Sequence, residues 1–202
     1  RRLTEAAEVQ APALERLAPD CVIVQGDTMS ALAGAIAAHL QGVPVVHVEA
    51  GLRTGDRASP WPEESSRQLS ARLATLHCAP TAGNRDNLLA EGIPAPAIAV
   101  TGNPVVDVLA AWLAAPAPGR RAERLLEAAG GRGVVLLTVH RRENFGARLA
   151  DYVGVLADWL RGRPELALVL PRHPNPAVEQ ALAPLRALPG QAIICEPLGY
   201  PD

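Results

Sequence analysis

Short apolar runs alternate with longer segments of mixed polarity along the whole chain, which predicts strands separated by helices. Most of these runs are continuous, as is typical of strands in a parallel sheet whose two faces are both covered. The predicted strands are Cys21–Gln25, Val43–Val48, Leu76–Ala79, Ile98–Thr101, Val134–Val139, Leu166–Leu170 and Ala192–Cys195. Helices are expected over 28–41, 63–74, 82–91, 104–115, 119–129, 147–162 and 176–187. The alternation indicates a doubly wound α/β architecture.

A change of composition marks a boundary between two domains. The stretch AAPAPGRRAERLLEAAGGRG begins as a Pro/Ala/Gly hinge, continues as a charged helix and ends in a glycine-rich turn. We expect one α/β domain over 1–113, a hinge or linker over 114–132, and the start of a second domain over 133–202. The GGRG sequence precedes a strand instead of following one, so we interpret it as a turn and not as a phosphate loop.

Composition and charge exclude several classes of function. The 202 residues carry a net charge of −2, which gives no footprint for nucleic acid or a membrane surface. No apolar run reaches the ~18 residues of a membrane span. All 19 basic residues are arginine, which excludes a catalytic or Schiff-base lysine and a P-loop lysine within this stretch. The motifs GxGxxG, GxxxxGK[ST] and GxSxG are absent, so NAD-binding, P-loop and α/β-hydrolase functions lose their main support.

The cysteines and the chain ends bear on compartment and completeness. Cys21, Cys78 and Cys195 are far apart and lie beside apolar runs, which is typical of reduced, buried cysteines in a cytoplasmic protein. Their spacing supports no zinc site, and no metal is expected. The chain begins at Arg1 and stops at Asp202 in what reads as the middle of an element, so we expect a fragment of a longer protein.

Acidic residues follow the first two predicted strands, at the sheet edge where open α/β proteins bind ligands. Asp27, in VIVQGDTMSA, either caps the helix that starts near Met29 or takes part in chemistry. Glu49, in HVEAGLRTGD, lies at or just past a strand end together with His47, Arg53 and Asp56. A carboxylate there is costly unless it is paired, for which Arg53 is the simple partner, or functional.

A third acidic stretch is SPWPEESSR, in which Glu63 and Glu64 begin a helix whose dipole favours acids in its first turn. Two adjacent acids at a helix start are common, so this stretch alone is weak evidence of function. Trp61 is either a core residue or a wall of a pocket.

The second domain carries cationic and imidazole groups in the corresponding places. TVHRRENFG places His140, Arg141 and Arg142 between a strand and a helix N-terminus, where a phosphate is readily held. RHPNP repeats the theme one strand later with His173. Carboxylates in one domain and anion binders in the other suit a substrate with a diphosphate at one end and a group processed by acid and base at the other.

These stretches together resemble the bacterial UDP-N-acetylglucosamine 2-epimerase family. GDTMSAL, HVEAGLRTGD, SPWPEE, TGNPVVD, HRREN and HPNP occur in the family's order from about residue 20 to the end. The resemblance implies a GT-B-like α/β fold of two doubly wound Rossmann-like domains, both incomplete in this chain, with UDP held mainly by the second.

The resemblance also implies a reaction. UDP-GlcNAc and UDP-ManNAc interconvert by inversion at C2, through anti elimination of UDP to a 2-acetamidoglucal and re-addition of UDP, with no cofactor. Three positions match the family's catalytic carboxylates, although the base that takes the C2 proton is not assigned: Asp27, Glu49 and Glu63. His140 matches a residue beside the diphosphate, with Arg141 also on the UDP side, and Arg141 and His173 match contacts to an allosteric UDP-GlcNAc in some members.

The chain departs from the family pattern in several places. Ser66 stands where many members have Asn, and Arg172 replaces a small apolar residue, which puts the allosteric site in doubt. The family's N-terminal glycine-rich loop and its UDP-gripping stretch would lie outside residues 1–202, so we expect no turnover by this polypeptide alone. Rival interpretations are a hydrolysing epimerase that releases ManNAc and UDP, a GT-B glycosyltransferase, and a non-catalytic nucleotide-sugar-binding remnant. The full-length protein is expected to be a cytoplasmic homodimer.

Overall fold

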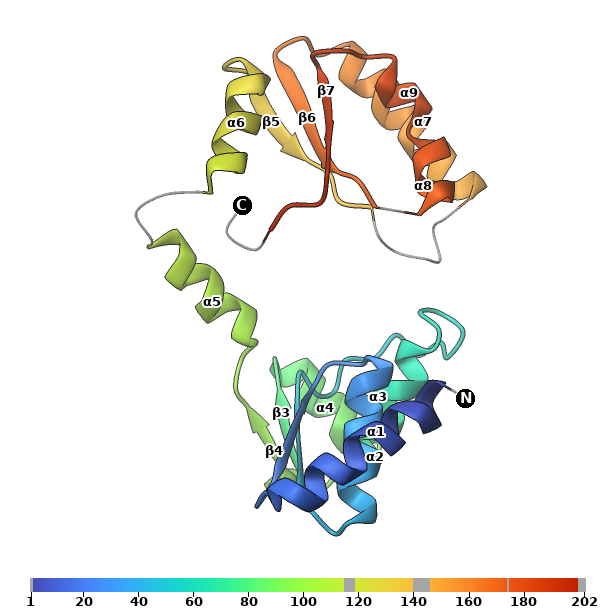
Figure 1. Ribbon diagram of the computed structural model, residues 1–202, viewed down its shortest axis with the longest axis vertical. Coiled ribbons are helices and arrows are strands. Elements are labelled where there is room, and N and C mark those ends of the chain that lie inside the picture. Colours follow the sequence, from blue (N-terminus) through green and yellow to red (C-terminus); the bar gives the residue numbers. More distant parts are fainter. Residues whose placement is uncertain (1, 115–118, 140–145, 174, 200–202) are drawn as a thin grey trace. The chain divides into compact units, whose positions relative to one another are not determined.

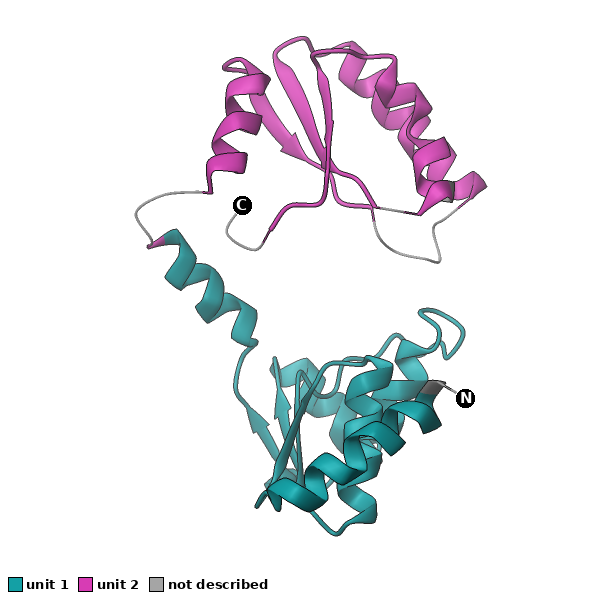
Figure 2. Cartoon of the chain, viewed as in Figure 1, with its two compact units in different colours: residues 1–113 teal, residues 114–202 magenta. Residues whose placement is uncertain are grey.

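The protein is seen in a computed structural model, which describes residues 2–114, 119–139, 146–173 and 175–199. The chain divides into two compact units, residues 1–113 and 114–202 (Figure 2). Each unit contains its own parallel sheet. The segment 114–132, expected to be a hinge, contains helix α6 (Arg120–Ala129), which packs on the sheet of the second unit.

The first unit is built on four parallel strands in the order β1-β2-β3-β4 (Figure 1). The strands are β1 Val22–Gln25, β2 Val45–Val48, β3 Leu76–Ala79 and β4 Ile98–Val100. The helices are α1 Arg2–Leu17, α2 Met29–Leu40, α3 Glu63–Leu73, α4 Ala82–Ala90, the 3₁₀ turn η1 Ala95–Ala97, and α5 Pro104–Leu113. Because each strand lies beside its successor, right-handed crossovers bring the connecting helices to one face of the sheet.

The core of the first unit lies between that face and the helices. Val24 and Val45 pack with Ala35 of α2 in one buried cluster, and Leu88 of α4 packs with Ala79 in another. Alanine and glycine dominate the sheet-facing side of α2, so the helix can approach the strands closely. Burial of these apolar side chains contributes roughly 25 cal/mol per Å² removed from water.

The opposite face of this sheet differs from the expectation that both faces are covered. Ile23, Val46 and Leu76 are register partners on neighbouring strands and so share that face. Ile23 and Leu76 are 67% and 37% exposed. The helices of the described chain that connect the strands lie on the other side, as the consecutive strand order requires.

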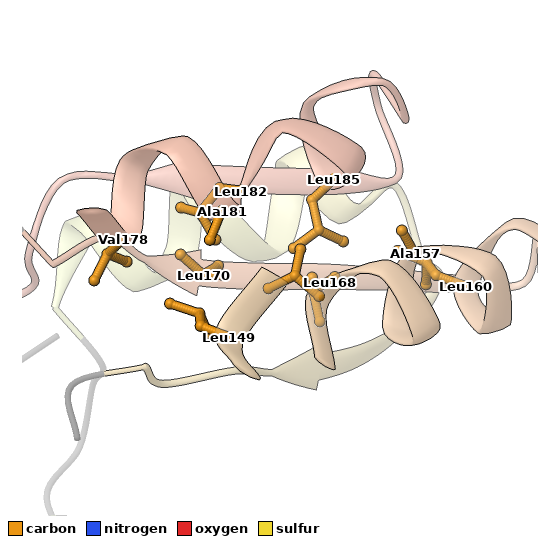
Figure 3. Packing of buried hydrophobic residues seen from close by; sticks show 10 residues of the cluster. Leu149, Ala157, Leu160, Leu168, Leu170, Val178, Ala181, Leu182 and Leu185 are labelled. Atoms are coloured by element: carbon orange, nitrogen blue, oxygen red, sulfur yellow. The ribbon is translucent and has the colours of Figure 1, made fainter. Parts of the chain in front are cut away.

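The second unit has three parallel strands in the order β5-β6-β7. They are β5 Gly133–Leu136, β6 Leu166–Pro171 and β7 Ala192–Cys195, and the further helices are α7 Ala147–Arg161, α8 Pro176–Ala181 and α9 Ala183–Arg186. Figure 1 shows α6 on one face of this sheet and α7, α8 and α9 on the other. Leu160 of α7, Leu168 and Leu170 of β6, and Leu182 between α8 and α9 are all fully buried in one cluster (Figure 3).

The predicted elements agree with this fold apart from three differences. The strands Leu76–Ala79 and Ala192–Cys195 match their predicted bounds, and the other strands differ only at their ends. The helix expected over 176–187 divides at Leu182, because Pro184 in the first turn of α9 cannot donate the hydrogen bond that would continue α8. Helix α1 was not predicted, since Pro12 lies inside it and breaks its pattern. No helix in the described ranges has the length and apolar character needed to cross a membrane.

Candidate functional site

The end of β1 answers the question raised by Asp27. Thr28, not Asp27, is the N-cap of α2, because its Oγ1 accepts a hydrogen bond from the backbone N–H of Ala31 at 3.1 Å. Of the two alternatives for Asp27, capping of this helix is therefore excluded. The Oδ2 atom of Asp27 instead lies 2.6 Å from Nη2 and 2.9 Å from Nε of Arg67 on α3. The carboxylate of Asp27 is thus held by a residue 40 positions away in the chain.

Glu49 lies at the end of the neighbouring strand β2, in a left-handed backbone conformation with φ +66°. Its Oε1 accepts a hydrogen bond from Nδ2 of Asn103, which follows β4, at 3.3 Å. Its Oε2 lies on the side of Gly26, 3.4 Å from the position that a Cβ atom would take there. The alternative in which Glu49 pairs with Arg53 is excluded, because Nε and Nη2 of Arg53 contact the carboxylate of Glu91 at 2.5 and 2.8 Å.

The two adjacent acids at the start of α3 have opposite environments. Glu64 is fully buried, and its carboxylate accepts hydrogen bonds from the Thr54 backbone N–H, Arg67 and Gln68 at 3.1, 3.2 and 3.3 Å. Burial alone would raise the pKa of Glu64, but these donors outweigh it and hold the pKa below its usual range. The Oε2 atom of Glu63 is buried and has no hydrogen-bond partner among the described residues.

Arg67 connects these acids. Its Nη1 contacts Oε2 of Glu64 at 3.2 Å while its Nε and Nη2 contact Asp27. Glu63 lies four residues before Arg67 on α3, and residues at this spacing share one face of a helix. The Arg67–Asp27 pair therefore ties the face of α3 that carries Glu63 to the end of β1.

His47 lies on β2 and contacts the backbone just after β1. The side chain is 1% exposed, and its Nε2 lies 2.9 Å from the carbonyl oxygen of Gly26. Burial lowers the pKa of His47 below its usual value, against the opposing effect of the Gly26 contact. The neutral ring then donates from Nε2 to Gly26, and the turn that carries Asp27 is fixed.

In the second unit, the carboxyl ends of the three strands surround a cavity of about 320 Å³. Its lining includes Thr138, Arg172, His173 and Leu198. Nδ1 of His173 accepts a hydrogen bond from the backbone N–H of Asn175 at 3.2 Å.

The candidate cationic residues of this unit were predicted to bind an anion. Arg172 contacts Oε1 of Glu196 through Nη2 at 2.6 Å and Nε at 2.8 Å, so its charge is already paired. The predicted residues His140 and Arg141 lie outside the described residues.

The contact between Glu49 and Asn103 and the bridging role of Arg67 were not predicted. The TGNP stretch was recognised as a motif, which was the available signal for Asn103, but no role was given to it. For Arg67, the sequence shows only a basic residue about one helical turn after the two acids Glu63 and Glu64. In the described residues, no group of three or more His, Cys, Asp or Glu side chains could hold a metal ion.

Comparisons with known proteins show which family the chain belongs to. The family described as UDP-N-acetylglucosamine 2-epimerase matches residues 3–202. A protein named probable UDP-N-acetylglucosamine 2-epimerase from Ralstonia nicotianae is 44% identical over 192 residues, which cover 93% of this chain and 51% of the relative. Two solved structures superpose well. They are UDP-GlcNAc 2-epimerase from Neisseria meningitidis bound to UDP-GlcNAc (TM-score 0.88, 35% identity, 98% of this chain and 54% of that one) and S. aureus MnaA with UDP (0.89, 34%, 97% and 53%).

The fold and the site thus define an α/β protein of the GT-B type with a row of carboxylates at the strand ends of its first unit. Within that class, the chain belongs to the UDP-N-acetylglucosamine 2-epimerase family. It spans about half the length of the curated relatives it matches.

Proposed function

We propose that the complete protein carrying this chain interconverts UDP-GlcNAc and UDP-ManNAc by inversion at C2. A base takes the C2 proton, the bond between C1 and the phosphate oxygen breaks, and UDP leaves with the bonding electrons on the opposite face. UDP then adds again to C1 of the 2-acetamidoglucal, and a proton returns to C2 from the other face. Atoms and electrons balance within the substrate, so the reaction calls for no redox cofactor.

The observation that carries this proposal is the gathering of acids at one sheet edge. Asp27 and Glu49 follow the adjacent strands β1 and β2, and Glu63 lies on the helix that Asp27 holds through Arg67. Proton removal and return at C2 need positioned carboxylates, and each such group typically contributes ~10²–10⁴-fold. The Oε2 atom of Glu63 is buried and has no hydrogen-bond partner among the described residues, which supports a role for it in proton transfer.

The second unit is proposed to hold UDP through residues that include His140 and Arg141. The cavity at its strand ends, which includes His173, supports this role, as do the relatives solved with UDP-GlcNAc and with UDP. The Arg172–Glu196 pair lies beside His173 and places a paired rather than a free cation there. An allosteric role for Arg141 and His173 belongs to the same proposal.

Product analysis tests the function. The complete gene product is incubated with UDP-GlcNAc and followed by ¹H and ³¹P NMR. We expect UDP-ManNAc to appear with no free sugar, while free ManNAc together with UDP would identify the hydrolysing reaction instead. Absence of any turnover would contradict the proposal. The 202-residue chain alone is expected to be inactive.

Compartment and assembly belong to the same proposal. Cys21 is exposed and Cys78 and Cys195 are only partly buried, so the prediction of buried cysteines is wrong. All three are free thiols, which favours a reducing compartment such as the cytoplasm. A homodimer is proposed for the complete protein, and light scattering of that protein would show whether its mass is twice that of one chain.

A further inference from the structure

Arg67 lies between two carboxylates that come from different elements. Three of its N–H groups are used: Nε and Nη2 toward Oδ2 of Asp27, and Nη1 toward Oε2 of Glu64. Only 13% of the Arg67 side chain is exposed, and the Glu64 side chain is completely buried. A guanidinium in this setting is planar and fixed, because both sides of its fork are occupied.

Glu64 anchors the guanidinium and takes no part in the open site. Its Oε2 also accepts from the Thr54 backbone N–H, and its Oε1 accepts from Gln68. Both oxygens are therefore engaged with the protein, and the carboxylate ties the loop after β2 to the first turns of α3. Glu64 sets where Arg67 lies, and Arg67 in turn sets where Asp27 lies.

The consequence for the site is a defined orientation of two acids. The hydrogen bond from Nε and the ion-pair contact of Nη2 both go to Oδ2 of Asp27, which leaves Oδ1 outside them. The same contact holds the start of α3 against the end of β1, and Glu63 lies one turn before Arg67 on that helix. A displacement of about 1 Å in such a group can lower a rate by ~10²-fold.

We propose that Arg67 is a positioning residue: anchored on Glu64, it orients the carboxylate of Asp27 and fixes the first turn of α3, which carries Glu63. This assignment rests on the proposed epimerase function. It divides the four acids around α3 and the strand ends into one anchor, Glu64, and three groups directed to the substrate.

The test compares variants of the complete gene product. Arg67→Met is expected to lower kcat by ~10²-fold with a much smaller change in KM, because orientation and not uniform binding is lost. Arg67→Lys should recover part of kcat. Arg72→Met, an exposed arginine on the same helix, is the matched control and should keep the wild-type rate.

A double-mutant cycle separates positioning from a merely structural role. If Arg67 acts through Asp27, Arg67→Met should cost much less in an Asp27→Asn background than in the wild type. Equal costs in both backgrounds, with the folded fraction unchanged, would overturn the proposal. If Arg67→Met does not fold, Arg67→Lys decides, because a wild-type kcat in that variant would also overturn the proposal.

The two proposals fail in different ways. No turnover by the wild-type protein would remove the epimerase function and the positioning role with it. Wild-type turnover together with unaffected Arg67 variants would remove the positioning role alone.

Discussion

Gly51 is the backbone position of the first unit at which a single methyl group should do the most damage. It lies two residues after Glu49 with φ +85°, and a Cβ atom there would come 2.2 Å from the carbonyl oxygen of Asn84 and 2.8 Å from its carbon. Those atoms belong to the backbone of α4, so they cannot rotate away. Asn87 also donates a hydrogen bond from Nδ2 to the Gly51 carbonyl at 3.0 Å, which holds the turn and the helix together.

The magnitude for Gly51→Ala follows from two contributions. The left-handed conformation costs a non-glycine residue roughly 1–2 kcal/mol. Forcing a methyl group into packed backbone adds roughly 1–3 kcal/mol. The expected loss in the free energy of unfolding is therefore about 2–5 kcal/mol. Activity of the complete protein should fall as well, because α4 must shift against the turn that carries Glu49.

Gly55→Ala is the matched control. Gly55 has φ +77°, but a Cβ atom there would meet nothing within 4 Å. Only the conformational cost of about 1–2 kcal/mol should remain. Urea denaturation followed by circular dichroism measures both variants. Equal losses at the two glycines would refute the packing of α4 against Gly51.

Three further changes test the site and the two cores. In the complete protein, each proposed catalytic acid is replaced by the amide of the same shape: Asp27→Asn, Glu49→Gln and Glu63→Gln. Each change should lower kcat by ~10²–10⁴-fold with an unchanged circular dichroism spectrum. Wild-type activity in a variant would exclude that residue from the chemistry. Burial lowers the pKa of His47 in the folded protein. Below about pH 6.5, His47 therefore binds a proton in the unfolded chain but not in the folded protein. The free energy of unfolding should therefore fall as the pH drops through that value. Urea midpoints measured at pH 7, 6 and 5 should fall less steeply in His47→Gln than in the wild type. The same dependence on pH in both proteins would contradict the lowered pKa of His47. In α7, Leu160→Ala should lower the free energy of unfolding by roughly 2–5 kcal/mol, because Leu160 is fully buried. Val155→Ala is the control and should cost less than about 0.5 kcal/mol, because Val155 is 72% exposed. Similar urea midpoints for the two variants would contradict the described core.

Apolar runs predicted the sheets well because buried parallel strands leave a clear signal in sequence. Leu76–Ala79 and Ala192–Cys195 needed no correction, and the boundaries of the other strands moved by a few residues. Helix α1 was not predicted; Pro12 lies inside it, and α1 packs along α2. The sequence alone does not show whether helices cover both faces of the first sheet. The order of the strands decides on which side the helices lie, and that order is seen only in the structure.

The candidate acids were predicted from motifs, but motifs do not reveal which residues these acids contact. Asp27 and Thr28 are both good capping residues, and the extended backbone at Thr28 gives it the cap. Arg53 is close to Glu49 in sequence but pairs with Glu91, and Asp27 pairs with Arg67, each across about 40 positions. Contacts of this range depend on which strands are neighbours, and local spacing does not encode them.

Exchange of the C2 proton with solvent tests the central claim most directly, because only chemistry at C2 requires the carboxylates gathered at the first sheet edge. The complete gene product is incubated with UDP-GlcNAc in D₂O, and the H2 signals are followed by ¹H NMR. We predict that deuterium enters C2 as UDP-ManNAc forms, and that Glu63→Gln slows both changes by ~10²–10⁴-fold. Sustained conversion with the C2 proton retained, or unchanged exchange in Glu63→Gln, would contradict the account.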